Sequence, residues 1–287
     1  MLELNEPLWN KLATMFRKEH VPTLLSALAV SWNDETESTL RWGELWHQNT
    51  CCGATYAAVP YLLKIAEPEE NRLQRLRIAL FLGQVVLDTG PRPDPGDRFE
   101  DEELRTLIVG CATEPVNAGD LEKMRSIMAE FYSALPAIRA LCERALLENW
   151  EVVDGYLLSG IAAADGLIGI ASLLNHGDGD EGGFTCASCG WGYEFIRFDE
   201  RFAVYAEAPR GAPHEHKASS DFKDGVPSRA DGFMTPITEE GVLDARVAAL
   251  LALAKRAPSP EPALLLRHFA GSFVCCKCGV QGPMHSV

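Results

Sequence analysis

Four cysteines in the C-terminal part of the chain have the spacing of ligands to a single metal ion. They lie in two clusters, FTCASCG over Phe184–Gly190 and FVCCKCG over Phe273–Gly279, and each cluster reads aromatic-x-Cys-x-x-Cys-Gly. Two thiolates three positions apart can bind one ion from a tight turn, and the glycine that follows lets the backbone make that turn. The pattern therefore predicts one structural zinc site with four ligands: Cys186, Cys189, Cys275 and Cys278.

The chemistry expected of such a site is structural. Four protein ligands complete the zinc tetrahedron, so no position stays open for water or substrate. Two alternatives remain, four unliganded thiols or two redox pairs, although neither pair begins a helix after a strand as a thioredoxin-type pair does. Cys276 and His285 are alternative ligands, but the two-residue spacing to Cys278 favours Cys275.

The two clusters resemble the turns of a zinc ribbon, in which two cysteine-bearing hairpins share one zinc ion. The resemblance covers the two motifs and the strands after the first motif. In this chain 85 residues separate Cys189 from Cys275, which is a longer insertion than a zinc ribbon usually has. Loop-closure entropy grows slowly with loop length, so this insertion is physically acceptable.

A second group of candidate residues lies in the N-terminal part of the chain. Trp42, Trp46 and His47 belong to the segment WGELWHQN, and Cys51 follows shortly after it. A histidine beside two tryptophans is more often a packing or capping residue, and a cysteine ahead of an apolar helix is most often buried. The functional alternative is a pocket for a ligand or partner where these four side chains meet.

An acidic run precedes the pattern of a short helix at residues 104–111. Negative charge at a helix start complements the helix dipole, which is a structural explanation. The functional alternative is a charged contact surface for a partner. The run consists of Glu100, Asp101, Glu102 and Glu103.

Composition and charge narrow the classes of partner. The chain has 287 residues, 47% of them hydrophobic, and a formal net charge of −15. Nucleic acid and anionic membranes both bind surfaces with clustered lysine and arginine. The negative net charge therefore argues against these partners and permits a basic protein partner. Nine cysteines without a recognisable export signal indicate reduced thiols and metal ligands, and hence a cytoplasmic protein.

The most apolar stretch of the chain is Leu157–Leu174, which approaches the length of a membrane span. It contains Asp165 and several glycines, and acidic residues flank it on both sides. We therefore predict a buried helix, or a pair of helices broken at Gly166 or Gly169.

The first 175 residues show the pattern of consecutive amphipathic helices. Apolar residues recur at helical spacing over residues 54–65, 73–87, 104–111, 121–135 and 138–145, with Asp120 as a predicted N-cap. Short helices with one apolar face bury it by stacking on their neighbours. The sequence thus predicts a mainly α fold, with a HEAT/ARM-like helical array over residues 1–175. A closed bundle is the alternative, and strands are not expected here.

Residues 176–287 are predicted to form a small α+β, zinc-ribbon-like module. Alternating apolar residues on either side of Asp199-Glu200 predict a β-hairpin over residues 193–205. An exposed loop follows at residues 211–231. A helix capped by Thr238 and a shorter helix at residues 263–269 then lead to the second cysteine cluster.

One segment carries a family resemblance. Leu45–Leu62, LWHQNTCCGATYAAVPYL, and Arg77–Gly83, RIALFLG, together resemble the opening of a group of bacterial HEAT-like repeat proteins. The shared pattern is a His-Gln pair, a helix rich in small residues and an arginine-led leucine helix. Some members of this group resemble immunity or partner-binding proteins beside secreted toxins. The resemblance implies a helical scaffold without catalytic residues.

These observations lead to three functional hypotheses, of which the third is a zinc-stabilised scaffold that binds no small ligand. The first is a cytoplasmic bacterial protein-binding scaffold with a structural zinc ion, and in its narrower form an immunity protein that neutralises a toxin through an acidic surface. The alternative is an enzyme, or an enzyme-associated subunit, that uses a pocket near Trp42, Trp46, His47 and Cys51. The chain contains no phosphate-binding loop, nucleophile elbow, zinc-protease motif or dinucleotide fingerprint, so no catalytic residue is predicted.

Overall fold

The chain forms two compact units, residues 1–145 and 146–287. The structure is a computed structural model that describes residues 1–16, 19–68, 71–90, 99–108, 115–148, 154–175, 181–207, 217–238 and 244–283. The composition of the chain predicts a division after residue 175. The structure divides the chain earlier, because the helices at residues 154–164 and 168–174 pack against helices near the C-terminus.

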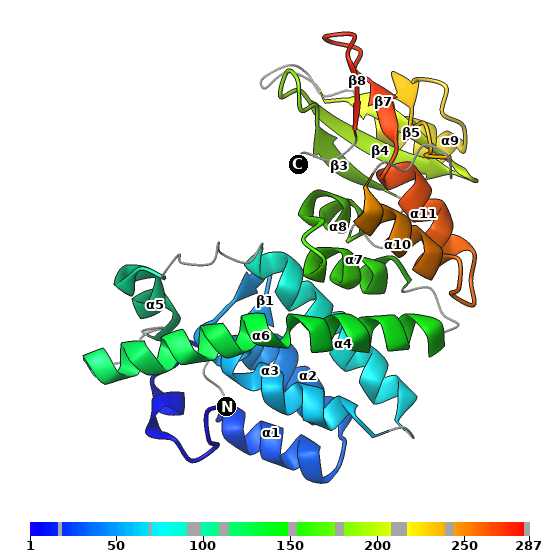
Figure 1. The fold of residues 1–287 in the computed structure, drawn as a ribbon. Helices are drawn as coiled ribbons and strands as arrows, with labels where there is room; N and C mark the ends of the chain where they lie inside the picture. The colour runs from blue at the N-terminus through cyan, green and yellow to red at the C-terminus, as the bar shows by residue number, and fades with distance from the viewer. Residues whose placement is uncertain are drawn as a thin grey trace. The chain divides into compact units, whose positions relative to one another are not determined.

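The first unit is built mainly from helices, as predicted (Figure 1). Its longest helices are α3, α4 and α6, and the predicted helical segments at residues 54–65 and 73–87 coincide with α3 and α4. In chain order the elements are η1 (Pro7–Asn10), α1 (Val21–Val30), α2 (Asp34–Ser38), η2 (Thr39–Leu45), β1 (Trp46–His47), β2 (Thr50–Cys51), α3 (Gly53–Ala66), α4 (Arg72–Thr89), α5 (Asp101–Ile108) and α6 (Ala118–Glu148).

Contacts between helices form the core of the first unit. The rings of Tyr56 on α3 and Phe131 on α6 meet edge to face, with centroids 5.1 Å apart. The buried thiol of Cys142 on α6 donates to the carbonyl oxygen of Ala79 on α4 at 3.4 Å. A β-carbon on Gly53 would lie 2.0 Å from the carbonyl oxygen of Leu107, so the start of α3 needs a glycine to approach α5 this closely.

A short hairpin between η2 and α3 was not predicted. Its strands β1 and β2 pair Trp46 with Cys51 and His47 with Thr50. Both residues of the connecting turn, Gln48 and Asn49, have positive φ angles of 47° and 60°, which is the type I′ geometry of two-residue hairpins. Two-residue strands are too short to show an alternating pattern, which explains why the sequence did not reveal them.

The start of α6 corrects the predicted N-cap. Asp120 lies inside the helix, and its carboxylate accepts a hydrogen bond from the Asn117 amide at 3.1 Å. The Asn117 side chain in turn accepts from the Asp120 amide at 3.0 Å. The two residues therefore form a reciprocal capping box in which Asn117 caps the helix and Asp120 supports the cap. Lys11 also donates to the Asp120 carboxylate, at 3.0 Å.

This capping box predicts a dependence of stability on pH. Burial opposes ionisation of Asp120, but the Asn117 amide and the Lys11 ammonium outweigh it and hold the pKa of Asp120 below its usual value. A depressed pKa stabilises the fold above about pH 4, where an unfolded aspartate is ionised, and this contribution is lost as pH falls through the folded-state pKa. Asp120→Asn should therefore cost about 1 kcal/mol at pH 7 and less at pH 3, as measured by urea unfolding. An equal cost at both pH values would contradict the charged cap.

The second unit contains a four-stranded antiparallel sheet with helices around it (Figure 1). The strand order is β3-β4-β5-β6, and the predicted hairpin at residues 193–205 corresponds to β4 and β5. In chain order the elements are α7 (Asp154–Ala164), α8 (Ile168–Leu174), β3 (Glu181–Thr185), β4 (Gly192–Phe198), β5 (Arg201–Ala206), α9 (Lys217–Asp224), β6 (Gly232–Phe233), α10 (Ala245–Ala254), α11 (Glu261–Phe269), β7 (Ser272–Val274) and β8 (Gln281–Pro283).

Both faces of this sheet carry buried side chains. On one face, Phe195 and Phe202 lie against Phe269 of α11, with ring centroids 5.2 Å apart in both pairs. On the other face, Tyr205 packs in a buried cluster with a residue of α9, and its hydroxyl donates to the buried carboxylate of Asp221 at 3.0 Å. The sheet is thus held between α9 and α11, and the ends of β3 and β4 carry the first cysteine cluster.

The apolar stretch at residues 157–174 forms two helices. Helix α7 ends at Ala164 and α8 begins at Ile168, and Gly166 between them has a φ of 76°. Of the alternatives that the sequence left open, the structure therefore shows the pair of helices with its break at Gly166, where glycine tolerates the left-handed conformation. Among the described residues, no helix has both the length and the apolar character needed to cross a bilayer.

The start of α10 differs from the prediction. Asp244 caps this helix through its carboxylate, which accepts from the Arg246 amide at 2.7 Å. The predicted cap, Thr238, lies before the helix, and residues 239–243 are outside the described residues. Aspartate and threonine both favour N-cap positions, so the sequence could not choose between two caps six positions apart.

Candidate metal centre

The first cysteine cluster forms the turn between β3 and β4. The amide of Cys186 donates to the carbonyl oxygen of Trp191 at 2.9 Å, and the amide of Gly190 donates back to the carbonyl oxygen of Cys186 at 2.8 Å. Gly190 has a φ of 70°, which favours glycine. This tight turn brings the side chains of Cys186 and Cys189 to one side.

The second cluster repeats the same turn between β7 and β8. Here the amide of Cys275 donates to the carbonyl oxygen of Val280 at 3.0 Å, and the amide of Gly279 donates to the carbonyl oxygen of Cys275 at 2.8 Å. Gly279 also has a φ of 70°. The matching sequence motifs therefore produce matching backbone geometry, as a pair of metal-binding turns requires.

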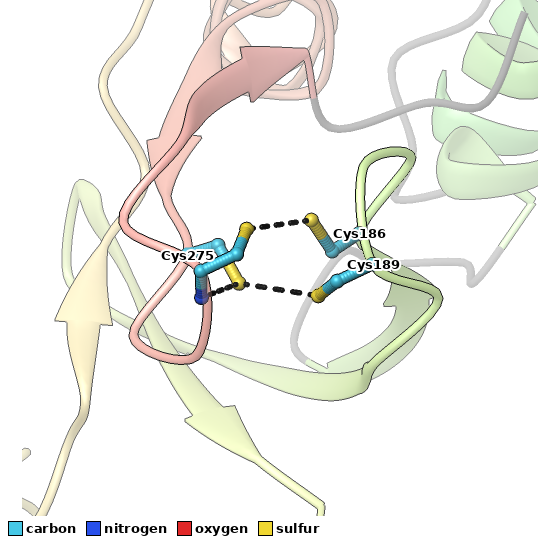
Figure 2. A group of neighbouring side chains, drawn as sticks. Cys186, Cys189 and Cys275 are labelled. Carbon is cyan, nitrogen blue, oxygen red and sulfur yellow. Dashed lines mark hydrogen bonds between the residues drawn. The ribbon is translucent and has the colours of Figure 1, made fainter.

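The two turns place four sulfur atoms around one point (Figure 2). All four lie within 4.8 Å of one another; the Sγ atoms of Cys186 and Cys278 are 3.9 Å apart, and those of Cys189 and Cys275 are 3.7 Å apart. A tetrahedral ion with metal–sulfur bonds of about 2.3 Å holds its sulfurs about 3.8 Å apart. The four predicted cysteines thus come together and could hold a metal ion.

Three aromatic rings connect the two turns beneath the sulfurs. Phe184 and Phe273, the aromatic residues that open the two motifs, meet edge to face with centroids 4.8 Å apart. Tyr193 of β4 stacks on Phe184 at 5.5 Å and lies edge-on to Phe273 at 5.1 Å. These contacts explain why each motif begins with an aromatic residue. The sequence did not single out Tyr193, because no spacing links it to the second cluster.

The thiols have different tendencies to ionise. Burial opposes ionisation of Cys275, but hydrogen bonds from the Tyr193 hydroxyl and nearby amides, including that of Cys278, lower its pKa to about 6. Cys189 is exposed; the Trp191 amide favours its thiolate, but partial desolvation of the sulfur and the neighbouring thiols raise the pKa of Cys189 to about 12. A divalent cation favours all four thiolates, so metal binding at this centre would release protons.

Cys276 and His285 were the alternative ligands. The side chain of Cys276 is exposed and lies outside the group of four sulfurs. Its Sγ atom is 3.5 Å from the Tyr193 hydroxyl. His285 lies outside the described residues. The geometry therefore favours Cys275 over its neighbour.

The aromatic candidates of the first unit lie in η2, which contains Trp42, and in strand β1 of the hairpin that follows it. The rings of Trp42 and Trp46 meet at 4.8 Å, and the Arg41 guanidinium lies 4.7 Å from the centre of the Trp42 ring. Phe16 joins them, because its amide donates to the carbonyl oxygen of Gly43 at 3.1 Å and its ring lies 5.3 Å from that of His47. We call Phe16, Trp42, Trp46 and His47 the aromatic surface.

Cys51 lacks the properties of a reactive residue in a pocket beside this surface. Burial raises the pKa of its thiol far above the usual value, and hydrogen bonds with Thr89 and Tyr56 offset this only in part. A thiol that stays protonated at neutral pH is a poor nucleophile. A cavity of about 240 Å³ in the first unit is lined by residues of α1, α3 and α4 and of the segments next to these helices, but by none of the four predicted pocket residues.

The acidic run at the start of α5 has a local structural role. The Glu103 carboxylate accepts from the Glu100 amide at 3.1 Å and so caps the first turn of the helix. Asp101 forms an ion pair with Arg125 of α6. The side chains of all four residues of the run are exposed: Glu100, Asp101, Glu102 and Glu103.

Comparisons with known proteins add no assignment to this geometry. The chain matches no protein-family model, no curated protein and no solved structure.

Proposed function

We propose that this protein is a protein-binding scaffold whose second unit is stabilised by one structural zinc ion. The arrangement of the four sulfur atoms supports the proposed binding of zinc, since tetrahedral sites with four cysteines are typical of structural zinc. Both turns are closed by their own hydrogen bonds, and four protein ligands leave no open coordination position. The zinc ion therefore contributes folding stability.

The observation that carries the binding function is the aromatic surface. Phe16 is 50% exposed and Trp42 is 44% exposed, although both are large apolar side chains. Grouped exposed aromatic residues mark interaction sites, and tryptophan is enriched among the residues that dominate binding energy. His47 is also exposed and contributes a ring with a polar edge.

The partner in this proposal is a protein with a basic surface. The net charge of −15 favours such a partner and would accelerate its association. The exposed acidic run of α5 belongs to the same unit as the aromatic surface. In its narrower form the proposal is a cytoplasmic, HEAT-like immunity protein that neutralises a toxin, which the resemblance of the segment at residues 45–62 supports.

This proposal predicts a large effect from a change in the aromatic surface. A tagged protein is used to isolate partners from its own host at low salt, and a captured basic protein is then titrated against variants. Trp42→Ala should weaken binding about 30-fold or more, the effect of losing a dominant contact residue. Phe222→Ala serves as the control, because Phe222 is 55% exposed but belongs to the second unit.

Salt provides a second criterion. Association with a basic partner should slow as salt is added, because screening weakens the attraction between opposite charges. If neither added salt nor Trp42→Ala changes the binding, the aromatic surface is not the binding site. Equal losses of binding affinity from Trp42→Ala and Phe222→Ala would also contradict the proposal.

A further inference from the structure

Tyr193 places a buried hydroxyl group beside the candidate metal centre. Its side chain is 1% exposed, and its oxygen lies 3.0 Å from the Sγ atom of Cys275 and 3.5 Å from that of Cys276. Phe184 and Phe273 fix the ring by stacking and edge contacts. The hydroxyl is therefore held in position by packing as well as by its hydrogen bonds.

The direction of these hydrogen bonds follows from counting protons. A metal-bound cysteine sulfur carries no proton and can only accept, and a tyrosine hydroxyl has a single proton to donate. The hydroxyl therefore donates to Cys275, at the shorter distance. The Tyr193 oxygen can still accept a hydrogen bond from the Cys276 thiol, at the longer distance of 3.5 Å.

We propose that Tyr193 is the residue that positions Cys275 as a metal ligand and tunes its sulfur, an inference that rests on the zinc site of the proposed function. Four thiolates around a divalent ion carry a net charge of −2. A donated O–H···S bond withdraws negative charge from one sulfur and so reduces the repulsion among the four. Groups that hydrogen-bond to metal ligands are commonly worth about 10- to 100-fold in metal affinity.

The proposal has a spectroscopic consequence that packing alone would not produce. A hydrogen bond to a thiolate lowers the energy of the sulfur electrons, so charge transfer from sulfur to a bound metal requires more energy. Cobalt(II), which reports such transitions, can replace zinc in the full-length protein. Loss of the hydroxyl should therefore move the sulfur-to-cobalt band to longer wavelength.

The experiment compares three variants loaded with cobalt(II) and then titrated with zinc. Tyr193→Phe removes the hydroxyl and keeps the ring; it should shift the band to longer wavelength and weaken zinc binding about 10- to 100-fold. Tyr205→Phe is the matched control. It also removes a buried hydroxyl group from the sheet, but that hydroxyl donates to Asp221 and not to a cysteine sulfur. Cys276→Ser tests the neighbour; neither control should move the band or the zinc affinity.

The outcomes separate this inference from the zinc site itself. A four-thiolate cobalt spectrum in the wild-type protein that Tyr193→Phe leaves unmoved, with zinc affinity unchanged, would overturn the role of Tyr193 alone. A band that Cys276→Ser shifts as far as Tyr193→Phe would also overturn it. A wild-type protein that binds neither cobalt nor zinc would overturn both the role of Tyr193 and the proposed zinc site.

Discussion

Chelation of the proposed zinc ion should unfold the β7–β8 hairpin and the turn between β3 and β4 while leaving α3 and α4 protected. The hairpin has two three-residue strands, and its main tie to the first cluster is the group of four sulfurs and the aromatic contacts beneath them. Structural zinc supplies on the order of 10 kcal/mol in small zinc-binding peptides, comparable with the stability of a whole domain. Amide hydrogen exchange, read by mass spectrometry before and after chelation, measures the effect.

Single substitutions test the same prediction residue by residue. Cys186→Ser and Cys275→Ser should each abolish stoichiometric zinc, measured by elemental analysis, and expose the amides of residues 272–283. Cys276→Ser is the control, because its exposed sulfur lies outside the group of four. Protection at residues 272–283 that survives chelation, or a zinc loss from Cys276→Ser equal to that from Cys275→Ser, would argue against this centre.

The second large effect is expected from Phe269→Ala, at about 3–5 kcal/mol of unfolding free energy. Phe269 has no exposed surface and joins α11 to the sheet through Phe195 and Phe202. Truncation removes the buried ring and leaves a cavity between two elements that cannot easily collapse. Urea unfolding of the metal-loaded protein, followed by a probe of the second unit, gives the measurement.

Phe222→Ala is the control for this substitution. It makes the same chemical change at a site that is 55% exposed, so it should change stability by less than about 0.5 kcal/mol. Similar costs for the two variants would mean that Phe269 does not anchor α11 to the sheet.

Much of this protein could be predicted from the sequence because the relevant physics is local. The Cys-x-x-Cys-Gly turns at Cys186 and Cys275 depend on a few adjacent residues, and both adopt the expected geometry. The β4–β5 hairpin and the helix break at Gly166 follow from alternation and from the conformational freedom of glycine. In the same way, the helical periodicity of α3 and α4 was visible directly in the spacing of apolar residues.

The tertiary structure decided what lies beside these local features. Tyr193 is 82 positions from Cys275, and Phe16 is far in sequence from His47, so no spacing could connect either pair. The packing of α7 and α8 against α11 likewise moved the division between the units away from the change in composition. The contacts that form are those whose apolar faces bury the most surface and fit each other in shape. A single sequence shows which faces are apolar, but it does not show which of these faces pack together.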